Sequence, residues 1–550
     1  MRRLLIAAVL VAGGCASSQV EPNDGLGYVA AIVDVDHDDV VIDEAFVSRC
    51  KTHSFTVRFG GSVVADAAGD GVIKITASDV TVDFEGTLNG AATDAVPDTF
   101  AGTGVRVEGA RNVHVRGLRV GGYKVGLRAT NADGLEMRDC LFDNLWRMHL
   151  KSTKEKEHND DWLWPHENDK QEWVTNYGAA ACIERSGGVK VQGVKVRRGQ
   201  NGIILDRVEQ GMLYDNDCSF LSGWGIAMWR SSKNLISRNA LDFCVRGYSH
   251  GKYNRGQDSA GLLMFEQCSG NTVVENSITH CGDGVFVFAG KEALGEKKPE
   301  ERELDYARLG CNDNVFARND LSFAPAHGLE VTFSFGNRIE ENLVEGNAIC
   351  GIWGGYSQET LVSGNKFYDN GARGAGEGGG VNIEHGYRNT VERNRFVGNS
   401  VALKLWDDDD GALLKTPWAV ANHRGSRENR FFHNGVAQKG GAALWVRKSL
   451  ETEVTDVTVR SIAGEAVQTV DSDDASTFAV PAPDTHLVAP QREVVAIGDT
   501  RPVGVRDQWW GREWIVMDEW GPIVPTDGAR TGVPRGVERN DPWAQLWNTP

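Results

Sequence analysis

A short alternating pattern of apolar and polar residues recurs along most of the chain. In HGLEVTFSFGNRIEENLVEGNAICGIWGG, residues 327–355, Gly328 is followed by apolar and polar residues in turn, and the pattern starts again 23 positions later at Gly351. Similar stretches are GIILD, GVFVF, GVNIE and ALKLW. Because successive side chains of a β-strand point to opposite faces, each stretch predicts a strand with two residues directed inward and two directed outward.

These strands recur at a nearly constant spacing. The commonest gap is 21 to 23 residues, and longer gaps read as one unit plus an insertion, with unit starts at Gly71, Gly104, Gly126, Arg147, Ala180, Gly202, Gly225, Gly261, Gly284, Gly328, Gly351, Gly380, Ala402 and Gly441. In many units a pair of asparagines five positions apart follows, such as Asn337 and Asn342. A unit this short cannot bury its own apolar face, so successive units must stack, with strands ~4.8 Å apart. We predict an all-β solenoid of about 14 coils, in which asparagines form hydrogen-bonded ladders.

Several complete units carry a resemblance to a known family. The units GIAMWRSSKNLISRN, GLEVTFSFGNRIEEN and GVNIEHGYRNTVERN resemble coils of the right-handed parallel β-helix proteins of the pectate-lyase-like superfamily, over roughly residues 60 to 450. The resemblance implies the fold but not the activity, because this fold carries lyases, hydrolases, epimerases and binding proteins. The SHG at 249–251 is similar to one polygalacturonase motif, but the paired aspartates and the RIK expected around it are missing, as is the DPHD of mannuronan epimerases.

Composition narrows the class of protein further. The chain has 550 residues, 65 glycines, 41% apolar residues and a formal charge of −18, which indicates a folded acidic protein. Acidity without a basic stripe argues against nucleic-acid binding. Apart from Cys15, the nine cysteines are scattered without metal-binding spacing; we expect most of them to be buried, with one or two disulfides left open. We expect a monomer.

The two ends of the chain differ from the repeats. Residues 1–15 have the form of an export signal, and AGGC before residue 16 resembles a bacterial lipobox, so we expect Cys15 to carry a lipid, with ordinary secretion or an uncleaved anchor as alternatives. The protein would then lie in the bacterial cell envelope and touch the membrane through this anchor alone. We expect a solenoid with an N-terminal cap over residues 28–470, a linker at 471–486, and a tryptophan-rich segment at 487–550 that packs on or caps the solenoid.

Insertions into the repeat indicate where a ligand would bind. They follow the glycine strand at 151–177, 291–310 and 407–425, and precede it at 245–259 and 371–379, so loops should wall both edges of one strand face. Loops on a rigid scaffold are where binding and catalytic residues concentrate. The insertions contain Trp162, Trp164, Tyr248, Tyr253 and Trp418, and exposed aromatic rings are natural platforms for sugars. We therefore expect an extended polysaccharide as the ligand.

The outward positions on this face change from apolar to polar along the chain. We place the chemistry in the later, polar half, where Glu330 and Glu384 lie two coils apart, ~10 Å along the stack. Carboxylates ~6.5–9.5 Å apart suit an inverting glycoside hydrolase. Our first hypothesis is hydrolysis by this pair, and the expected substrate contacts are Trp229, Trp353, Asn382, His385 and Trp406.

Two other groups of residues suggest additional or alternative chemistry. His250, Arg255 and Asp258 lie beside the coil that bears Glu266 and could orient a sugar or supply a proton. Asp407 and Asp408, in the run 407–410, could hold calcium through oxygen ligands, with Lys404 as the base of a polysaccharide lyase. We expect no other cofactor, and a non-catalytic carbohydrate-binding or adhesion protein is the third hypothesis.

Overall fold

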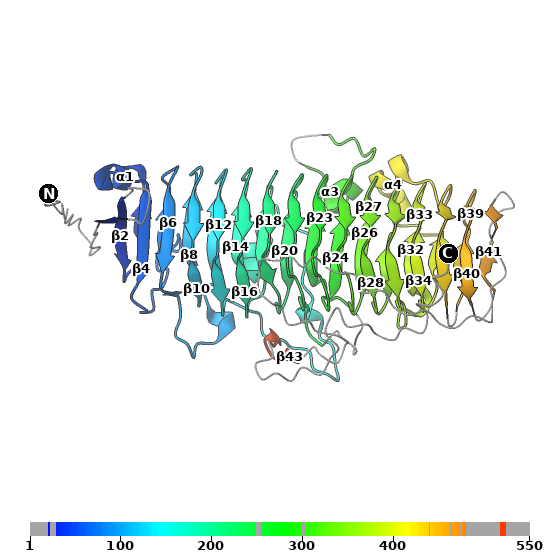
Figure 1. Ribbon diagram of the computed structural model, residues 1–550, viewed down its shortest axis with the longest axis horizontal. Coiled ribbons are helices and arrows are strands. Elements are labelled where there is room, and N and C mark those ends of the chain that lie inside the picture. The colour runs from blue at the N-terminus through cyan, green and yellow to red at the C-terminus, as the bar shows by residue number, and fades with distance from the viewer. Residues whose placement is uncertain are drawn as a thin grey trace.

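The computed structural model describes residues 20–22, 29–248, 253, 255–299, 303–438, 441–462, 465–471, 476–479 and 517–523. Its short strands stack in parallel along one long axis, so that each coil of the chain hydrogen-bonds to the coils before and after it (Figure 1). The expected all-β, right-handed parallel β-helix is confirmed. His250 and Cys15 lie outside the described residues, as do the whole predicted export signal and most of residues 480–550.

Three strand faces run along the stack, and the one built from the glycine strands is sheet 1. Its 15 strands, in spatial order, are β3 (Val40–Ile42), β5 (Ile73–Ile75), β8 (Thr103–Glu108), β11 (Val125–Thr130), β14 (Ala179–Glu184), β17 (Ile203–Asp206), β20 (Trp224–Trp229), β22 (Ala260–Phe265), β24 (Asp283–Phe288), β26 (His327–Thr332), β29 (Cys350–Trp353), β32 (Gly379–Glu384), β35 (Leu403–Trp406), β38 (Leu444–Arg447) and β41 (Val467–Val470). All of these strands pair in parallel.

Sheet 2 has 17 strands. They are β1 (Val20–Pro22), which pairs antiparallel, and then β2 (Val29–Val35), β4 (Ser54–Phe59), β6 (Thr81–Glu85), β9 (His114–Arg116), β12 (Glu136–Arg138), β15 (Lys190–Gln192), β18 (Met212–Tyr214), β21 (Leu235–Ser237), β23 (Thr272–Val274), β25 (Val315–Ala317), β27 (Arg338–Glu340), β30 (Leu361–Ser363), β33 (Thr390–Glu392), β36 (Arg430–Phe432), β39 (Glu453–Thr455) and β42 (Thr477–Phe478). Where a coil carries an asparagine pair, its sheet 2 strand lies between the two asparagines, as β27 does between Asn337 and Asn342.

Sheet 3 is divided into two groups of five strands. The first comprises β7 (Leu88–Asn89), β10 (Arg119–Gly121), β13 (Leu141–Asp143), β16 (Lys195–Arg197) and β19 (Asp217–Cys218), and the second β28 (Leu343–Glu345), β31 (Lys366–Tyr368), β34 (Arg395–Val397), β37 (Gly435–Ala437) and β40 (Thr458–Ser461). Single bridges through Ala240, Ser277 and Asp320 connect the two groups, so the coils remain continuous.

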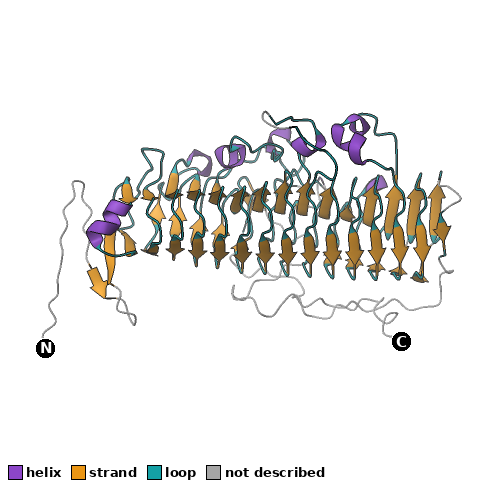
Figure 2. Ribbon diagram, turned by 90° about the horizontal axis from the view of Figure 1, so that it is seen from above, coloured by secondary structure: helices purple, strands orange, loops and turns teal. Residues whose placement is uncertain are grey.

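Helices are few and short. They are α1 (Glu44–Cys50), α2 (Glu172–Tyr177), α3 (Lys291–Leu294) and α4 (Pro417–Asn422), with 3-10 turns η1 (Pro97–Thr99), η2 (Asn159–Asp161), η4 (Ala375–Glu377) and η5 (Leu413–Lys415). α1 lies at the N-terminal end of the stack, and the other helices gather along one of its long sides (Figure 2). No helix in the described ranges is both long and apolar enough to cross a membrane.

The interior of the solenoid is one continuous apolar core. Inward residues of neighbouring strands lie over one another, as Leu329 does over Ile352. The asparagines form the expected ladders: the Nδ2 atoms of Asn239, Asn276 and Asn319 each donate to the Oδ1 atom of the next asparagine at 2.9 to 3.0 Å. These side chains are buried. Their structural role is therefore confirmed, because each satisfies a buried turn that water cannot reach.

Most cysteines in the described ranges are buried, as expected. All nine in the described ranges are free, and eight of them are buried.

Two sequence-based boundaries are wrong. No coil starts at Arg147, because β11 pairs directly with β14, and residues 151–177 lie before the sheet 1 strand and not after it. The prediction divided the gap between Gly126 and Ala180 into two units, whereas the chain uses it for one coil, with β11, β12 and β13, followed by one insertion. Likewise, Thr477 and Phe478, inside the predicted linker, form β42, which pairs with β39 and extends sheet 2 by one strand.

Candidate functional site

Sheet 1 has a covered half and an open half. From β14 to β24, its outward residues are mostly apolar, with Glu184 and Asp206 as exceptions. The apolar ones pack beneath α2 and form a second buried cluster that includes Trp173, Ile204, Ala227 and Leu263. Trp229 belongs to this cluster: it is 1% exposed, and its Nε1 donates to Oδ1 of Asp169. The expectation that Trp229 contacts a ligand is therefore wrong, because the insertion that was expected to wall the face lies across it.

Where the cover ends, three carboxylates and a histidine converge at the start of the open half. We call Asp258, Asp283, His327 and Glu330 the acidic centre. Nδ1 of His327 lies 3.0 Å from Oδ1 of Asp283 and 3.4 Å from Oε2 of Glu330, and the backbone N–H of His327 also donates to Asp283. Asp258 comes from the 245–259 insertion, which passes so close to Asp283 that a side chain at Gly256 would strike that carboxylate.

The acidic centre shifts the protonation of its members. Burial opposes charge on the imidazole, but the ion pairs with Asp283 and Glu330 outweigh it and raise the pKa of His327 to about 10. Burial, with the charges of Asp283 and Glu330, raises the pKa of Asp258 to about 7. Burial also raises the pKa of Glu330, although His327 counteracts it. Near neutral pH the centre thus holds an imidazolium at His327 beside an Asp258 carboxyl group that is partly protonated.

An aromatic strip continues from the acidic centre along the open half. Strand register places Glu330, Trp353, Asn382, Lys404 and Trp445 in one column across β26, β29, β32, β35 and β38. Trp353 and Trp445 are partly exposed, as is Trp406 in the neighbouring column. The aromatic strip, defined as Trp353, Trp406 and Trp445, is an outward surface that rings of a sugar could contact.

Lys404 lies within the strip. Its Nζ is 4.3 Å from the ring centre of Trp445 and 5.6 Å from that of Trp406, and it donates to the carbonyl of Gly376. Burial lowers the pKa of this lysine.

Asn382, between Trp353 and Lys404 in the column, is a structural residue. It is buried, its Nδ2 donates to the Glu377 carbonyl at 2.9 Å, and its Oδ1 accepts from Nε1 of Trp406 at 2.8 Å. The predicted substrate contact by Asn382 is therefore wrong, because both ends of its amide are occupied by the Glu377 carbonyl and by Trp406 of the aromatic strip.

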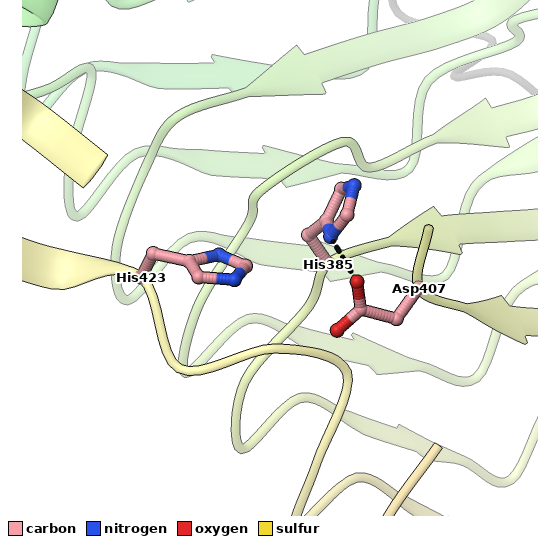
Figure 3. A group of neighbouring side chains, drawn as sticks. All are labelled: His385, Asp407 and His423. Carbon is pink, nitrogen blue, oxygen red and sulfur yellow. Dashed lines mark ion pairs between the residues drawn. The ribbon is translucent and has the colours of Figure 1, made fainter. Parts of the chain in front are cut away.

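A second titratable group, the histidine cluster, consists of His385, Asp407 and His423 (Figure 3). The His385 side chain is buried, and its Nδ1 lies 2.8 Å from Oδ1 of Asp407, while its Nε2 lies 3.2 Å from Asp408 and 3.7 Å from Glu384. His423 follows α4, and its ring points toward the other two side chains in Figure 3. His385 is thus covered from the surface and is not placed to contact a sugar directly.

Aromatic rings and charges surround the histidine cluster. Tyr356 stacks on His385 with ring centres 4.4 Å apart, and its hydroxyl donates to Asp410. Burial raises the pKa of Glu384 to about 7, with Asp408 and Asp410 adding to the shift and His385 opposing it. Trp418 of α4 is fully buried and donates to the carbonyl of Leu309, which fixes the insertion.

Glu330 and Glu384 belong to different clusters. The strand register aligns Glu330 with Asn382, so Glu384 lies two coils away and two residues further along its strand. That offset places their Cα atoms ~12 Å apart, from a strand spacing of ~4.8 Å and a rise of ~3.3 Å per residue. Each glutamate has nearer acidic partners, Asp283 for Glu330 and Asp408 for Glu384, so the geometry favours two separate centres over the expected pair.

The other predicted site residues lie apart from the acidic centre. Glu266 is buried beneath α3 and accepts from the backbone N–H of Glu292. Arg255 is exposed and pairs with Glu157 at 3.3 Å. The aspartates of 407–410 do not share one oxygen cage: Asp407 and Asp408 face His385, Asp410 faces Tyr356, and Asp409 is exposed beside Lys448.

Asp283, His327, His423 and Trp445 were missed by the sequence analysis. Asp283 and His327 each stand directly before the glycine of a unit, and outward positions were counted only after that glycine. A polar residue at the same phase in two successive units was the available signal. No sequence signal pointed to His423, because its position depends on how the 407–425 insertion folds back.

Comparisons with known proteins agree with the fold. A family model described as a right handed beta helix region matches residues 177–353 and 302–416. No curated protein sequence matches the chain.

Solved structures were also compared. The A-module of Azotobacter vinelandii mannuronan C-5 epimerase AlgE6 is 14% identical, with 81% of this chain and 97% of that chain covered and a TM-score of 0.42. Tailspike protein 3 of bacteriophage CBA120 is 11% identical, with coverages of 81% and 61% and a TM-score of 0.37. Similarity this distant carries no information about activity.

Proposed function

We propose that this protein hydrolyses glycosidic bonds of an extended polysaccharide at the acidic centre. The observation that carries the proposal is that Asp283 and Glu330 pair with His327 where the covered half of sheet 1 gives way to the aromatic strip. Asp258 lies close enough to both carboxylates for their charges to raise its pKa. Glycoside hydrolysis needs one carboxyl group that holds a proton and one carboxylate that does not. Burial favours a proton on Asp258, while the imidazolium of His327 favours the carboxylate form of Glu330.

Each member of the centre has a role in this proposal. Asp258, whose pKa is raised to about 7, donates a proton to the departing glycosidic oxygen. Glu330 points outward, is 18% exposed and is paired with the imidazolium of His327, so it acts as the base that takes a proton from the attacking water. His327 and Asp283 are positioning residues. The imidazolium stabilises the carboxylate form of Glu330, and Asp283 holds His327 through one hydrogen bond to the ring Nδ1 and one from the backbone N–H.

The test is a screen of purified protein on a panel of polysaccharides, following new reducing ends and the absorbance of unsaturated uronates. We expect reducing ends without the unsaturated chromophore, a rate unaffected by chelators, and a loss of at least ~100-fold in Glu330→Gln and Asp258→Asn, the usual range for acid–base groups. Glu340→Gln on β27 and Asp143→Asn on β13 are matched controls in ion pairs on the other sheets.

The two carboxylates have separable signatures. An aryl glycoside with a good leaving group needs no protonation, so it should restore the rate of Asp258→Asn but not that of Glu330→Gln. Equal rates for Asp258→Asn and the unaltered protein on polysaccharide would contradict its role as the acid.

A second candidate function is β-elimination with Lys404 as the base. The observation in its favour is the lowered pKa of Lys404 within the aromatic strip. The unsaturated chromophore, lost in Lys404→Gln, would assign the protein to this reaction. Binding without any product, weakened by substitutions in the aromatic strip, would indicate a carbohydrate-binding scaffold.

A further inference from the structure

The histidine cluster differs from the acidic centre in how its imidazole is satisfied. Nδ1 of His327 makes a hydrogen bond of 3.0 Å to Asp283. Nδ1 of His385 is just as close to a carboxylate, 2.8 Å from Oδ1 of Asp407, yet it has no hydrogen-bond partner among the described residues, because the oxygen lies off the direction of an N–H bond. The His385 side chain is completely buried. A close nitrogen and oxygen that do not point at each other are typical of two ligands that point at a third atom.

His423 supplies a second nitrogen of the same kind. Its Nδ1 is inaccessible to solvent and has no partner in the described part of the chain. One ligand atom from each of His385, Asp407 and His423 lies within 4.8 Å of the others. Ligands of a tetrahedral ion with bonds of ~2.0–2.1 Å stand ~3.3 Å apart. Side-chain rotations that move the ligand atoms by about 1 Å would therefore complete the site.

The group also has the surroundings of a metal site. With Nδ1 as a ligand, Nε2 of His385 carries the proton and donates to Oδ1 of Asp408 at 3.2 Å, which is the carboxylate support common behind metal-binding histidines. Tyr356 stacks on the same ring and holds its plane. Asp407 accepts from the backbone N–H of Ser426 through its other oxygen, Oδ2. The ligands would therefore be held in place before an ion arrives.

We propose that His385, Asp407 and His423 bind one divalent transition metal ion of the zinc class, with Asp408 as a positioning residue for His385. Two imidazole nitrogens and one carboxylate oxygen match the preferences of zinc, and three protein ligands leave a fourth position for water. Calcium prefers six to eight oxygen ligands, which this group does not offer. The proposal is independent of the hydrolytic function, because neither Asp258 nor Glu330 takes part in it.

The ion would connect distant parts of the chain. His385 directly follows β32, Asp407 directly follows β35, and His423 returns from the far end of the 407–425 insertion. A bound metal would therefore pin the end of α4 to the edge of sheet 1.

The experiment is calorimetric titration of tag-free, chelator-treated protein with zinc chloride and, separately, calcium chloride. We expect one equivalent of zinc, no calcium binding at this site, and loss of zinc binding by at least ~100-fold in both Asp407→Asn and His423→Gln. Asp408→Asn should weaken zinc by about 10–100-fold, the range for supporting residues. His433→Gln is the matched control, because His433 pairs with Asp456 on a turn away from the cluster.

Further measurements distinguish loss of metal binding from loss of folding. Circular dichroism and melting curves of each variant show whether it folds, and His423→Ala provides a second test at the same position. Cobalt substitution should give visible absorption bands of a tetrahedral ion in the unaltered protein and in His433→Gln, but not in folded His423→Gln. Zinc binding that persists in Asp407→Asn and His423→Gln, or that is absent from the unaltered protein, would overturn the proposal.

Discussion

His327 and His385 both lie beside carboxylates, but their imidazole nitrogens are satisfied differently. His327 is hydrogen-bonded to Asp283 and paired with Glu330, so its charge is compensated within the acidic centre. His385 leaves one nitrogen without a hydrogen bond beside Asp407 and donates or accepts with Asp408 at the other. The two histidines differ in the direction of the Nδ1–carboxylate contact and not in its distance. The hydrogen-bonded imidazolium of His327 shifts the pKa values of neighbouring acids, whereas the nitrogen of His385 without a hydrogen bond is available to bind a metal ion.

Asp258 should make the stability of the protein depend on pH. Its pKa rises from 3.8 in the unfolded chain to about 7 in the fold, so folding favours the protonated form. The stability that this group contributes is complete below about pH 4 and is lost as the pH rises to about 7. In Asp258→Asn that loss is absent. The free energy of unfolding of the unaltered protein, relative to the variant, should fall by about 1–3 kcal/mol over this window.

Urea denaturation at several pH values between about 4 and 8 measures this difference. Asp143→Asn is the matched control, since Asp143 pairs with Arg198 on sheet 3 away from the centre. Parallel stability profiles for the unaltered protein and Asp258→Asn would show that this carboxyl is not buried against Asp283 and Glu330.

Asn276 should be among the most sensitive non-catalytic residues. Its amide donates to Asn319 and Ile236, and its Oδ1 accepts from the backbone and side chain of Asn239, all in buried surroundings. Asn276→Ala leaves several buried groups without partners, at about 1–3 kcal/mol each. We expect a loss of more than ~3 kcal/mol in urea denaturation. Asn159→Ala, at an exposed position, should change stability little, and equal effects at both positions would contradict the ladder argument.

At the scale of the element, the sequence was sufficient for the strands and insufficient for the insertions. The glycine phase and the asparagine pairs predicted sheet 1 and the ladders, because residues of one coil contact those at the same phase in the next. Arg147 was assigned to a coil because a gap of fixed length was assumed, whereas folding removes residues 147–177 from the repeat altogether.

The candidate site shows the same division. Glu330 and Asp258 could be placed from the repeat and from the insertion beside it. The burial of Trp229 and the approach of His423 could not, because both depend on where an insertion without a repeat pattern comes to rest.

The 407–425 insertion should be protected from trypsin by zinc. Lys415 and Arg424 are exposed in this segment, and the proposed metal holds its end to sheet 1 through His423. Where cleavage requires the insertion to open, a ligand present at about ten times its dissociation constant should slow cleavage about 10-fold. Mass spectrometry of timed digests measures each bond separately.

Cleavage at Lys154, exposed in another insertion, is the internal control and should not respond to zinc. His423→Gln should be cut at the same rate with and without the metal. Protection that survives in this variant would mean that zinc acts elsewhere on the chain.

On the scale of the whole molecule, the stack of coils turns a column of single residues into a linear binding surface. The column from Glu330 to Trp445 spans four strand steps, ~19 Å at ~4.8 Å per step. If a polysaccharide lies along the axis, short oligosaccharides bound at the acidic centre touch Trp353, and only longer ones reach Trp445. Affinity should therefore rise with oligosaccharide length and then level off once the column is filled.

Substitutions in the column should separate short ligands from long ones. In the Glu330→Gln background, which prevents turnover, Trp353→Ala should weaken oligosaccharides of every length about 10-fold, or ~1.4 kcal/mol, whereas Trp445→Ala should weaken only those long enough to reach it. Tryptophan fluorescence titration with a size series measures both. Trp164, 55% exposed on the insertion over the covered half, is the matched control. If Trp164→Ala lowered the affinity in a length-dependent way and Trp445→Ala did not, the polysaccharide would lie across the covered half. That result would contradict an alignment along the open column.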